Sequence, residues 1–405
     1  MCTTQLRTNH VLCVPHVGPH AAVPQLALEA AQQSIVLLKN TDGVLPLKPG
    51  GKLAVVGPHA DGTEVFMSNY HGSACPDGKF DCITMPWQAI EAANAGGQTK
   101  MLHAVNVNDN KGEDIAGAVA LSQWADHVIL VLGLDQTIEA EGRDRYNSTL
   151  PAVQLQLAQA VFATGKPTIV LLVHGGAMTL GDVRNNSSAI MDCFYGGIRA
   201  ADAMANVLFG AYNPTGKLAV TMYPEGYLNS LPLTQMSVKQ APGRTHLYYT
   251  GKPEFAFGDG LSYSTLEVEF AGAAEEPLPG TGSSGRLLTT SREDNTAVYT
   301  VTARNVGGPA GGVTLLAFWR PLGTHAGPLR QRLFDFRGTF VPRGGNTTLT
   351  FTLPLASLAV ADDSGDRTVY PGEYEVFFKG ASAVPLSSRL SVTGQARIVE
   401  KFVPL

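Results

Sequence analysis

The residues of this chain with the most chemistry to offer lie in one short segment, TIEAEGRDR. Glu139 and Glu141 are two positions apart, and Asp144 and Arg145 follow them closely. A carboxyl group partly withdrawn from water can act as a general acid near neutral pH, because desolvation raises its pKa. Side chains two apart lie on the same side of an extended loop and can converge in a turn. The pattern therefore nominates Glu139 and Glu141 for acid/base chemistry.

A plain structural interpretation competes with that one. Asp144 and Arg145 could form a local ion pair that fixes the loop, and the whole segment would then be a solvated loop closed by a salt bridge. The segment directly follows HVILVLGL, residues 127–134, an apolar run typical of a buried strand. The residues alone leave both interpretations open.

Other motifs that carry chemistry give little support to other functions. No G-x-G-x-x-G follows the first strand, no G-x-x-x-x-G-K-[ST] occurs, and no G-x-S-x-G occurs, so nucleotide and serine-hydrolase functions are poorly supported. His59, His71 and His174 follow predicted strands without metal-ligand spacing, and we interpret them as hydrogen-bonding loop residues. We therefore expect no metal and no cofactor.

Composition describes an ordinary globular chain of 405 residues with a net charge of −5. Such a charge provides no basic field for nucleic acid or an anionic membrane, and no apolar run approaches the roughly 20 residues of a membrane helix. Five cysteines are too few for a disulfide scaffold. Cys75 and Cys82 enclose a turn-rich segment and are equally consistent with a small loop disulfide and with two free thiols. Cys193 is predicted to be a buried small hydrophobe.

Helices and apolar strands alternate through the first part of the chain, which predicts a mainly parallel sheet covered by helices on both faces. The predicted helices begin near residues 25, 86, 113, 151 and 199, and the predicted strands are 34–38, 52–56, 100–107, 127–134, 167–173 and 217–224. In such sheets ligands meet the loops beyond the carboxyl ends of the strands, and TIEAEGRDR occupies such a position.

After residue 260 the pattern changes to short alternating strands separated by Gly, Pro and Asn turns. This pattern predicts a β-sandwich of the immunoglobulin or fibronectin type. The expected organisation has four parts: an N-terminal tail, 1–24; an α/β sandwich domain, 25–235; a connecting segment, 236–261; and a fibronectin type III-like domain, 262–405.

Several longer segments resemble family 3 glycoside hydrolases, in the order in which that family has them. They are ALEAAQQSIVLLKNTDGVLPL, LFGAYNPTGKLAVTMYP, FAFGDGLSYSTLE, LFDFRGTFVPRGGNTTLTFTL and YPGEYEVFFKG. The resemblance runs from about residue 24 to about residue 396. GPHADGTEVFMSNYHG, TIEAEGRDR and GRTHLYYTGKPEFAFG look closest to the β-xylosidase branch, which also includes α-arabinofuranosidases.

The resemblance implies retaining hydrolysis of O-glycosyl bonds in xylan-derived oligosaccharides, with one carboxylate as nucleophile and a second as acid/base. The family's acid/base glutamate maps onto Glu141, with Glu139 as the alternative because the doubled EAE leaves the register uncertain by two residues. Asp144 and Arg145 would then shape and hold the loop. The implied partner is a xylo-oligosaccharide-like substrate, and the implied location is extracellular or in the cell wall. The sequons at Asn147, Asn185, Asn186 and Asn346 are compatible with secretion.

One departure from the family bears on activity. The family nucleophile is an aspartate of a preceding barrel domain, whereas the residues before the first helix here contain neither Asp nor Glu, nor the apolar core of a secretory signal. We therefore expect the isolated chain to be inactive, to need a barrel domain in trans, or to self-associate through the uncovered face. The alternative is a non-catalytic carbohydrate-associated or protein-binding module. A smaller departure is His174, which stands where relatives usually carry a small polar residue.

Overall fold

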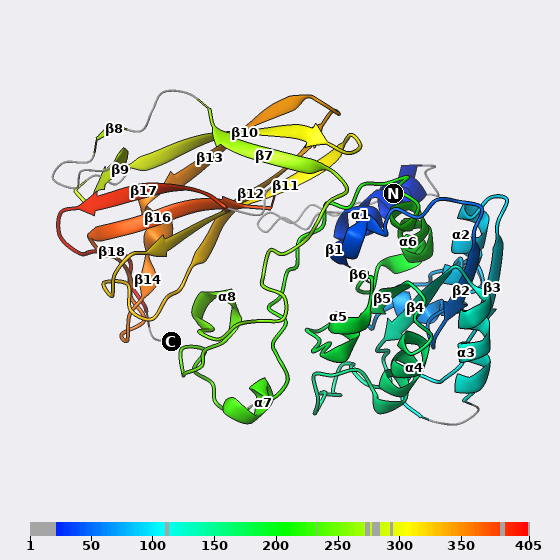
Figure 1. Ribbon diagram of the computed structural model, residues 1–405. Helices are drawn as coiled ribbons and strands as arrows, with labels where there is room; N and C mark the ends of the chain where they lie inside the picture. Colours follow the sequence, from blue (N-terminus) through cyan, green and yellow to red (C-terminus); the bar gives the residue numbers. More distant parts are fainter. Residues whose placement is uncertain are drawn as a thin grey trace, which may run out of the picture.

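The computed structural model describes residues 22–109, 113–232, 234–271, 276–277, 284–291, 295–380 and 385–403. The expected N-terminal tail lies almost wholly outside these residues. Figure 1 shows an α/β region and a strand-rich region side by side, joined by an extended segment that includes two short helices, α7 (Tyr227–Ser230) and α8 (Thr245–Tyr248).

The α/β region is built on one six-stranded sheet with the order β1-β6-β5-β4-β2-β3. Its strands are β1 (Val36–Asn40), β2 (Lys52–Val56), β3 (Gln98–Leu102), β4 (His127–Gly133), β5 (Thr168–Val173) and β6 (Ala189–Asp192). All neighbouring pairs are parallel except β1 and β6. The predicted mainly parallel sheet is confirmed, with β1 as an antiparallel edge strand.

Helices cover both faces of this sheet, as Figure 1 shows. The helices are α1 (Ala22–Ser34), α2 (Pro86–Ala93), α3 (Ile115–Trp124), α4 (Ala152–Phe162), α5 (Asp182–Asn186) and α6 (Ala200–Leu208). Val128, Leu130 and Leu132 of β4 pack with α3, α4 and α5, whereas Ile129 and Val131 pack with α1, α2 and α6. Because alternate side chains point to opposite faces, one apolar strand can supply both cores.

One predicted strand is wrong, and one observed strand was not predicted. Residues 217–224 form no strand, because their backbone pairs with a later segment instead of the sheet: the amides of Leu218 and Met222 donate to the carbonyls of Asp259 and Phe255. The remaining strand of the sheet is β6, which sequence patterns did not predict. Its four residues are fully buried between β1 and β5.

The strand-rich region is a β-sandwich, as predicted. One sheet has the order β13-β10-β7, a second has β12-β11-β16-β17-β9-β8, and a small third has β14-β15-β18. The strands are β7 (Thr265–Phe270), β8 (Glu276–Pro277), β9 (Ser284–Thr289), β10 (Thr296–Gly307), β11 (Gly311–Pro321), β12 (Arg332–Val341), β13 (Asn346–Pro354), β14 (Val360–Ala361), β15 (Arg367–Val369), β16 (Gly372–Lys379), β17 (Leu386–Thr393) and β18 (Arg397–Glu400). Its core contains large buried aromatic side chains, including Trp319, Tyr374 and Phe378.

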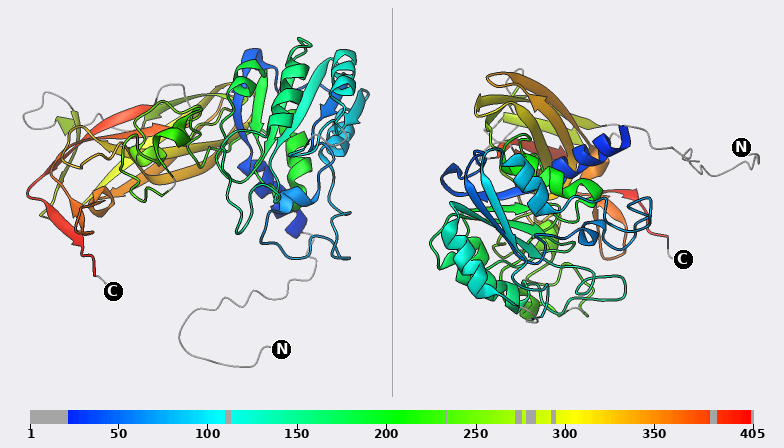
Figure 2. Two further views of the ribbon diagram at one scale, coloured as in Figure 1. Left: turned by 90° about the horizontal axis from the view of Figure 1, so that it is seen from below. Right: turned by 90° about the vertical axis from the view of Figure 1, so that its right-hand side faces the viewer.

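The two regions are in direct contact through the segment that follows α8. Phe257 lies edge-on to Phe318 of β11, with ring centroids 6.0 Å apart. Lys379 at the end of β16 forms an ion pair with Asp259, with a separation of 2.6 Å between Nζ and Oδ1. Figure 2 shows from two further directions that the sandwich extends away from one side of the α/β region.

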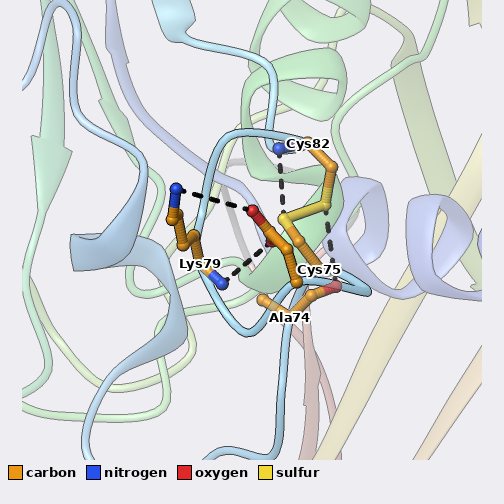
Figure 3. The surroundings of a disulfide bond; sticks show 5 residues. Ala74, Cys75, Lys79 and Cys82 are labelled. Atoms are coloured by element: carbon orange, nitrogen blue, oxygen red, sulfur yellow. Dashed lines mark hydrogen bonds and ion pairs between the residues drawn. A yellow bond between two sulfur atoms is a disulfide. The ribbon is translucent and has the colours of Figure 1, made fainter.

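A disulfide closes part of the long loop between β2 and α2. Cys75 and Cys82 are bonded, which decides between the two alternatives that the sequence left open. The Cys82 amide also donates to Sγ of Cys75 at 3.1 Å, and the Lys79 amide donates to Asp77 within the closed loop (Figure 3). Cys193 is buried at the end of β6, as predicted.

Candidate active site

The charged segment is the loop that follows β4, and it begins with a turn built on Asp135. The amides of Ile138 and Glu139 both donate to the Asp135 carbonyl. A tight turn follows, in which Ala140 and Arg143 exchange both of their backbone hydrogen bonds, at 3.2 and 2.9 Å. Gly142 has φ of 69°, a conformation that a glycine adopts without strain. Glu139 therefore lies just before this turn, and Glu141 lies within it.

Glu139 lies at the base of the turn, and its carboxylate is surrounded by donors. Gly175 and Gly176, which follow β5, donate their backbone amides to it. Tyr195, which follows β6, donates its hydroxyl at 2.9 Å, and burial together with the neighbouring Glu139 raises the pKa of that hydroxyl. Arg145 Nε lies 3.1 Å from Oε2, and both side chains are about 85% buried, with 16% and 15% exposure. Because two backbone amides, a hydroxyl and a guanidinium group contact its oxygens, Glu139 is suited to anchoring the loop.

Arg145 forms an ion pair with Glu139 and not with Asp144, so the prediction of a local ion pair between Asp144 and Arg145 is wrong. The guanidinium group also donates to the Ala177 carbonyl at 2.9 Å and contacts Met178 Sδ at 3.5 Å. The loop after β4 is thereby fastened to the loop after β5. Asp144 points elsewhere: it is exposed and makes no hydrogen bond or ion pair with any residue that the structure describes.

Glu141 sits at the exposed tip of the turn. Its only described contact is with Tyr70, whose hydroxyl donates to Oε2 at 2.5 Å, and this hydrogen bond raises the pKa of the tyrosine. Tyr70 comes from the long loop between β2 and α2, on the N-terminal side of the Cys75–Cys82 disulfide, and it is 83% exposed. Tyr146, five residues after Glu141, is 99% exposed. The carboxyl group of Glu141 is therefore accessible and is in contact with one solvent-exposed tyrosine, Tyr70.

A buried charge pair supports the turn that holds Glu139. His174 and Asp192, at the ends of β5 and β6, are both fully buried, and Nε2 lies 3.1 Å from Oδ1 in an alignment too poor for a hydrogen bond. The other ring nitrogen, Nδ1, lies 2.7 Å from the Gly176 carbonyl. Burial, the largest single influence, lowers the pKa of His174, but the carboxylate of Asp192, the Gly176 carbonyl and the carboxylate of Glu139 together outweigh burial and raise it. The His174 side chain thus fixes the Gly175–Gly176 turn from behind, through its contact with the Gly176 carbonyl.

His59, the other buried histidine of this group, plays no part in these contacts. Its side chain is 2% exposed, and burial lowers its pKa to about 4, so it is neutral at physiological pH. His71 lies before the disulfide-closed segment and contacts Phe80, which is within that segment, edge-on. Among the residues that the structure describes, no group of three His, Cys, Asp or Glu side chains could hold a metal ion.

Sequence reasoning did not identify the partners of the two glutamates. Tyr70, Tyr195, Gly175 and Gly176 come from other loops, between 36 and 71 positions from the glutamate that each contacts. The signal that could have found the glycines is the HGG that follows β5, because a glycine pair after a parallel strand is a place where a carboxylate can approach the backbone closely. No comparable signal marks the tyrosines.

Comparison with known proteins shows which family has this arrangement of domains. Residues 35–263 match the C-terminal domain of glycosyl hydrolase family 3, and residues 314–382 match a fibronectin type III-like domain. The chain thus has the domain pair of a family of carbohydrate-cleaving enzymes. It belongs to glycosyl hydrolase family 3.

Relatives over nearly the whole chain are xylosidases. The chain is 32% identical to a probable exo-1,4-beta-xylosidase, xlnD, of Aspergillus terreus, over 92% of this chain and 47% of that protein. It is 33% identical to beta-D-xylosidase 1 of Arabidopsis thaliana, over 89% of this chain and 50% of that protein. A solved family 3 exo-beta-xylosidase, XlnD, bound to a xylobiose aziridine activity-based probe, superimposes with a TM-score of 0.81 at 27% identity, over 94% of this chain and 50% of that one. The chain therefore spans about half the length of these relatives.

No helix among the described residues is both long enough and apolar enough to cross a bilayer.

Proposed function

We propose that this chain supplies the acid/base half of a retaining β-xylosidase, with Glu141 as the general acid/base. Exposure at the tip of the turn carries the proposal, because the carboxyl group that protonates a leaving oxygen must reach the substrate. Glu139 is a poor candidate for the same role, because backbone amides, a tyrosine hydroxyl and an arginine already occupy its oxygens. The substrate class follows from the xylosidase relatives.

In the proposed reaction, Glu141 first donates its proton to the oxygen of the departing sugar while a second carboxylate attacks the anomeric carbon. It then takes a proton from the water that hydrolyses the glycosyl-enzyme intermediate. Tyr70, which already donates a hydrogen bond to Glu141, would orient this carboxyl group. The nucleophilic carboxylate would come from a barrel domain, as the family resemblance implies, either in a longer polypeptide or in trans. We also propose that the protein is secreted.

The test removes the proposed acid/base from the chain in the presence of a family 3 barrel domain. Glu141→Gly should lose hydrolysis of xylobiose by about 100-fold or more. With an aryl β-xyloside, whose leaving group needs no proton, azide should restore turnover to Glu141→Gly and yield the β-xylosyl azide. This outcome is expected because the small anion can attack the covalent intermediate without a general base.

Glu139→Gln is the matched control on the same loop. It should lower stability by roughly 2–3 kcal/mol, because it leaves Arg145 unpaired in a largely buried site, and azide should not rescue it.

Without the barrel domain the chain should turn over far more slowly than about once per second. Full activity of Glu141→Gly on xylobiose would refute the assignment. Absence of turnover with any barrel domain would favour a non-catalytic carbohydrate-associated module.

A further inference from the structure

A surface cavity of about 360 Å³ lies beside the loop that carries Glu141. The residues of its wall that matter here are Asp144, Asn147, Ser148, Tyr223, Tyr227 and Leu228. Small-molecule sites typically enclose about 300–1,000 Å³ and combine aromatic walls with a few polar groups. The cavity therefore has the size and the composition of a binding site for one small ring.

The aromatic wall is rigid. Tyr223 and Tyr227 stack with their ring centroids 3.8 Å apart and an interplanar angle of 8°. Tyr249 packs edge-on against both, at 5.0 and 5.4 Å. The hydroxyl of Tyr223 accepts a hydrogen bond from the Thr245 amide, and that of Tyr227 donates to the Gly243 carbonyl. Because the hydroxyls are engaged with the backbone, the rings can offer their carbon surface to a ligand.

The polar wall offers both an acceptor and a donor. Asp144 is an exposed carboxylate that makes no hydrogen bond or ion pair within the described part of the chain. Asn147 uses its side-chain oxygen to accept from the Thr149 amide at 3.0 Å, which leaves its amide nitrogen as a donor. Sugar hydroxyl groups both donate and accept, and the C–H face of a pyranose ring is apolar. The cavity wall therefore offers polar groups for the hydroxyls of a sugar and an aromatic surface for its C–H face.

Other ligand classes fit less well. The one cationic residue in the wall, Arg145, is already neutralised by Glu139 at 3.1 Å, so an anion would gain little. A wholly apolar ligand would desolvate the Asp144 carboxylate without compensation.

We infer that this cavity is a second saccharide subsite, which takes a pyranose unit of the oligosaccharide whose glycosidic bond lies at Glu141. The inference rests on the proposed function for the place of the scissile bond. Asp144 and Glu141 are three residues apart on one loop, and Arg145 joins that loop to the wall of the cavity. A sugar chain that runs past the tip of the turn would therefore reach the stacked tyrosines.

The experiment measures equilibrium binding of xylotriose to the full chain, produced without N-glycans so that the sequon at Asn147 is unmodified. Titration calorimetry and saturation-transfer NMR are expected to detect binding with a dissociation constant on the order of 1 mM. Tyr227→Leu and Asp144→Asn should each weaken binding by about three- to tenfold, the effect of losing a contact face or a hydrogen bond. Phe336→Leu and Asp42→Asn are the matched controls, because both residues are exposed and lie outside the cavity.

Binding requires no nucleophile and no proton transfer, so this test is independent of the proposed reaction. Glu141→Gln should keep xylotriose binding within about twofold even though it lacks the proposed acid. Unchanged binding in both Tyr227→Leu and Asp144→Asn, or no binding of xylotriose at concentrations about tenfold above the expected constant, would overturn the subsite.

Discussion

At the scale of single residues, Glu139 and Glu141 have the same side chain but different surroundings. The turn formed by Ala140 and Arg143 directs Glu139 toward the ends of β5 and β6 and leaves Glu141 at the surface. The oxygens of Glu139 are occupied by four donors, whereas the exposed carboxyl group of Glu141 is open to a substrate. The division of roles is therefore a property of the backbone conformation between the two residues.

The buried pair behind this turn makes stability depend on pH. His174 has a raised pKa in the folded chain, above the ordinary value of 6.5 that it returns to on unfolding. Its contribution to the unfolding free energy is fully present below pH 6.5 and is lost as the pH rises through the folded-state pKa. We expect urea unfolding of the native chain to show this decline, and His174→Asn to remove it.

The readout must separate the pair from a general loss of stability. His174→Asn should also lower stability at all pH values, because Asp192 would stay buried without its partner. The informative quantity is the slope of the unfolding free energy against pH above 6.5, which should flatten in the variant. An identical slope in both proteins would mean that His174 does not titrate with folding.

Sequence patterns pointed to this loop as the candidate site but did not predict the arrangement within it. The doubled EAE spacing placed both glutamates on one side of an extended chain, and the tight turn at Gly142 changes that relation. Arg145 was expected to pair with its neighbour Asp144, yet its partner is Glu139, because the loop folds back on itself. The contacts of Tyr70 with Glu141 and of Tyr195 with Glu139 depend on how separate loops pack together in the fold. Local sequence patterns contain no information about this packing.

At the scale of elements, the same limit explains which strands were found. Long apolar runs such as β4 and β5 are recognisable from composition, because strands buried on both faces are continuously apolar. The four-residue β6 is too short to give such a signal. Residues 217–224 have strand-like composition, but their hydrogen-bonding partners lie near residue 255, outside the sheet. Strand propensity does not specify which partner a segment selects.

Tyr70 reaches Glu141 from the long loop between β2 and α2, and the Cys75–Cys82 disulfide closes a later part of this loop. Replacing both cysteines, Cys75→Ser with Cys82→Ser, should destabilise this loop by about 2 kcal/mol, because the bond restricts a short chain segment in the unfolded state. Hydrogen exchange of residues 68–85 should become faster, while exchange of β4 and β5 should not change. Reductant should have the same effect on the native chain and no further effect on the variant. Equal protection of the loop with and without the bond would contradict this role.

At the scale of the whole molecule, the candidate site belongs to the α/β region alone. Every described contact of Glu139 and Glu141 comes from loops of that region. The sandwich is fastened on another side, through Lys379 with Asp259 and through the ring contact between Phe257 and Phe318. The sandwich therefore supports the fold without contributing a side chain to the candidate site.

The exposed tip around Glu141 has the composition of a contact surface. Tyr70 and Tyr146 are 83% and 99% exposed, and tyrosine is enriched at the energetic centres of protein interfaces. We expect this surface to bind a family 3 barrel domain, or a second copy of the chain when no barrel domain is present. Light scattering over a concentration series should show association, and Tyr70→Ser or Tyr146→Ser should weaken it by about tenfold or more.

The physical reason is the hydrophobic cost of leaving two aromatic rings in water, which an interface relieves by burying them. Phe336→Ser is the matched control: this ring is 62% exposed but lies on β12 of the sandwich, away from the tip, so its loss should leave association unchanged. A polar, hydrated contact would behave differently, since many contacts between domains gain little from single side chains. A chain that stays strictly monomeric and ignores the barrel domain would show that these tyrosines serve the substrate or the loop and not a partner surface.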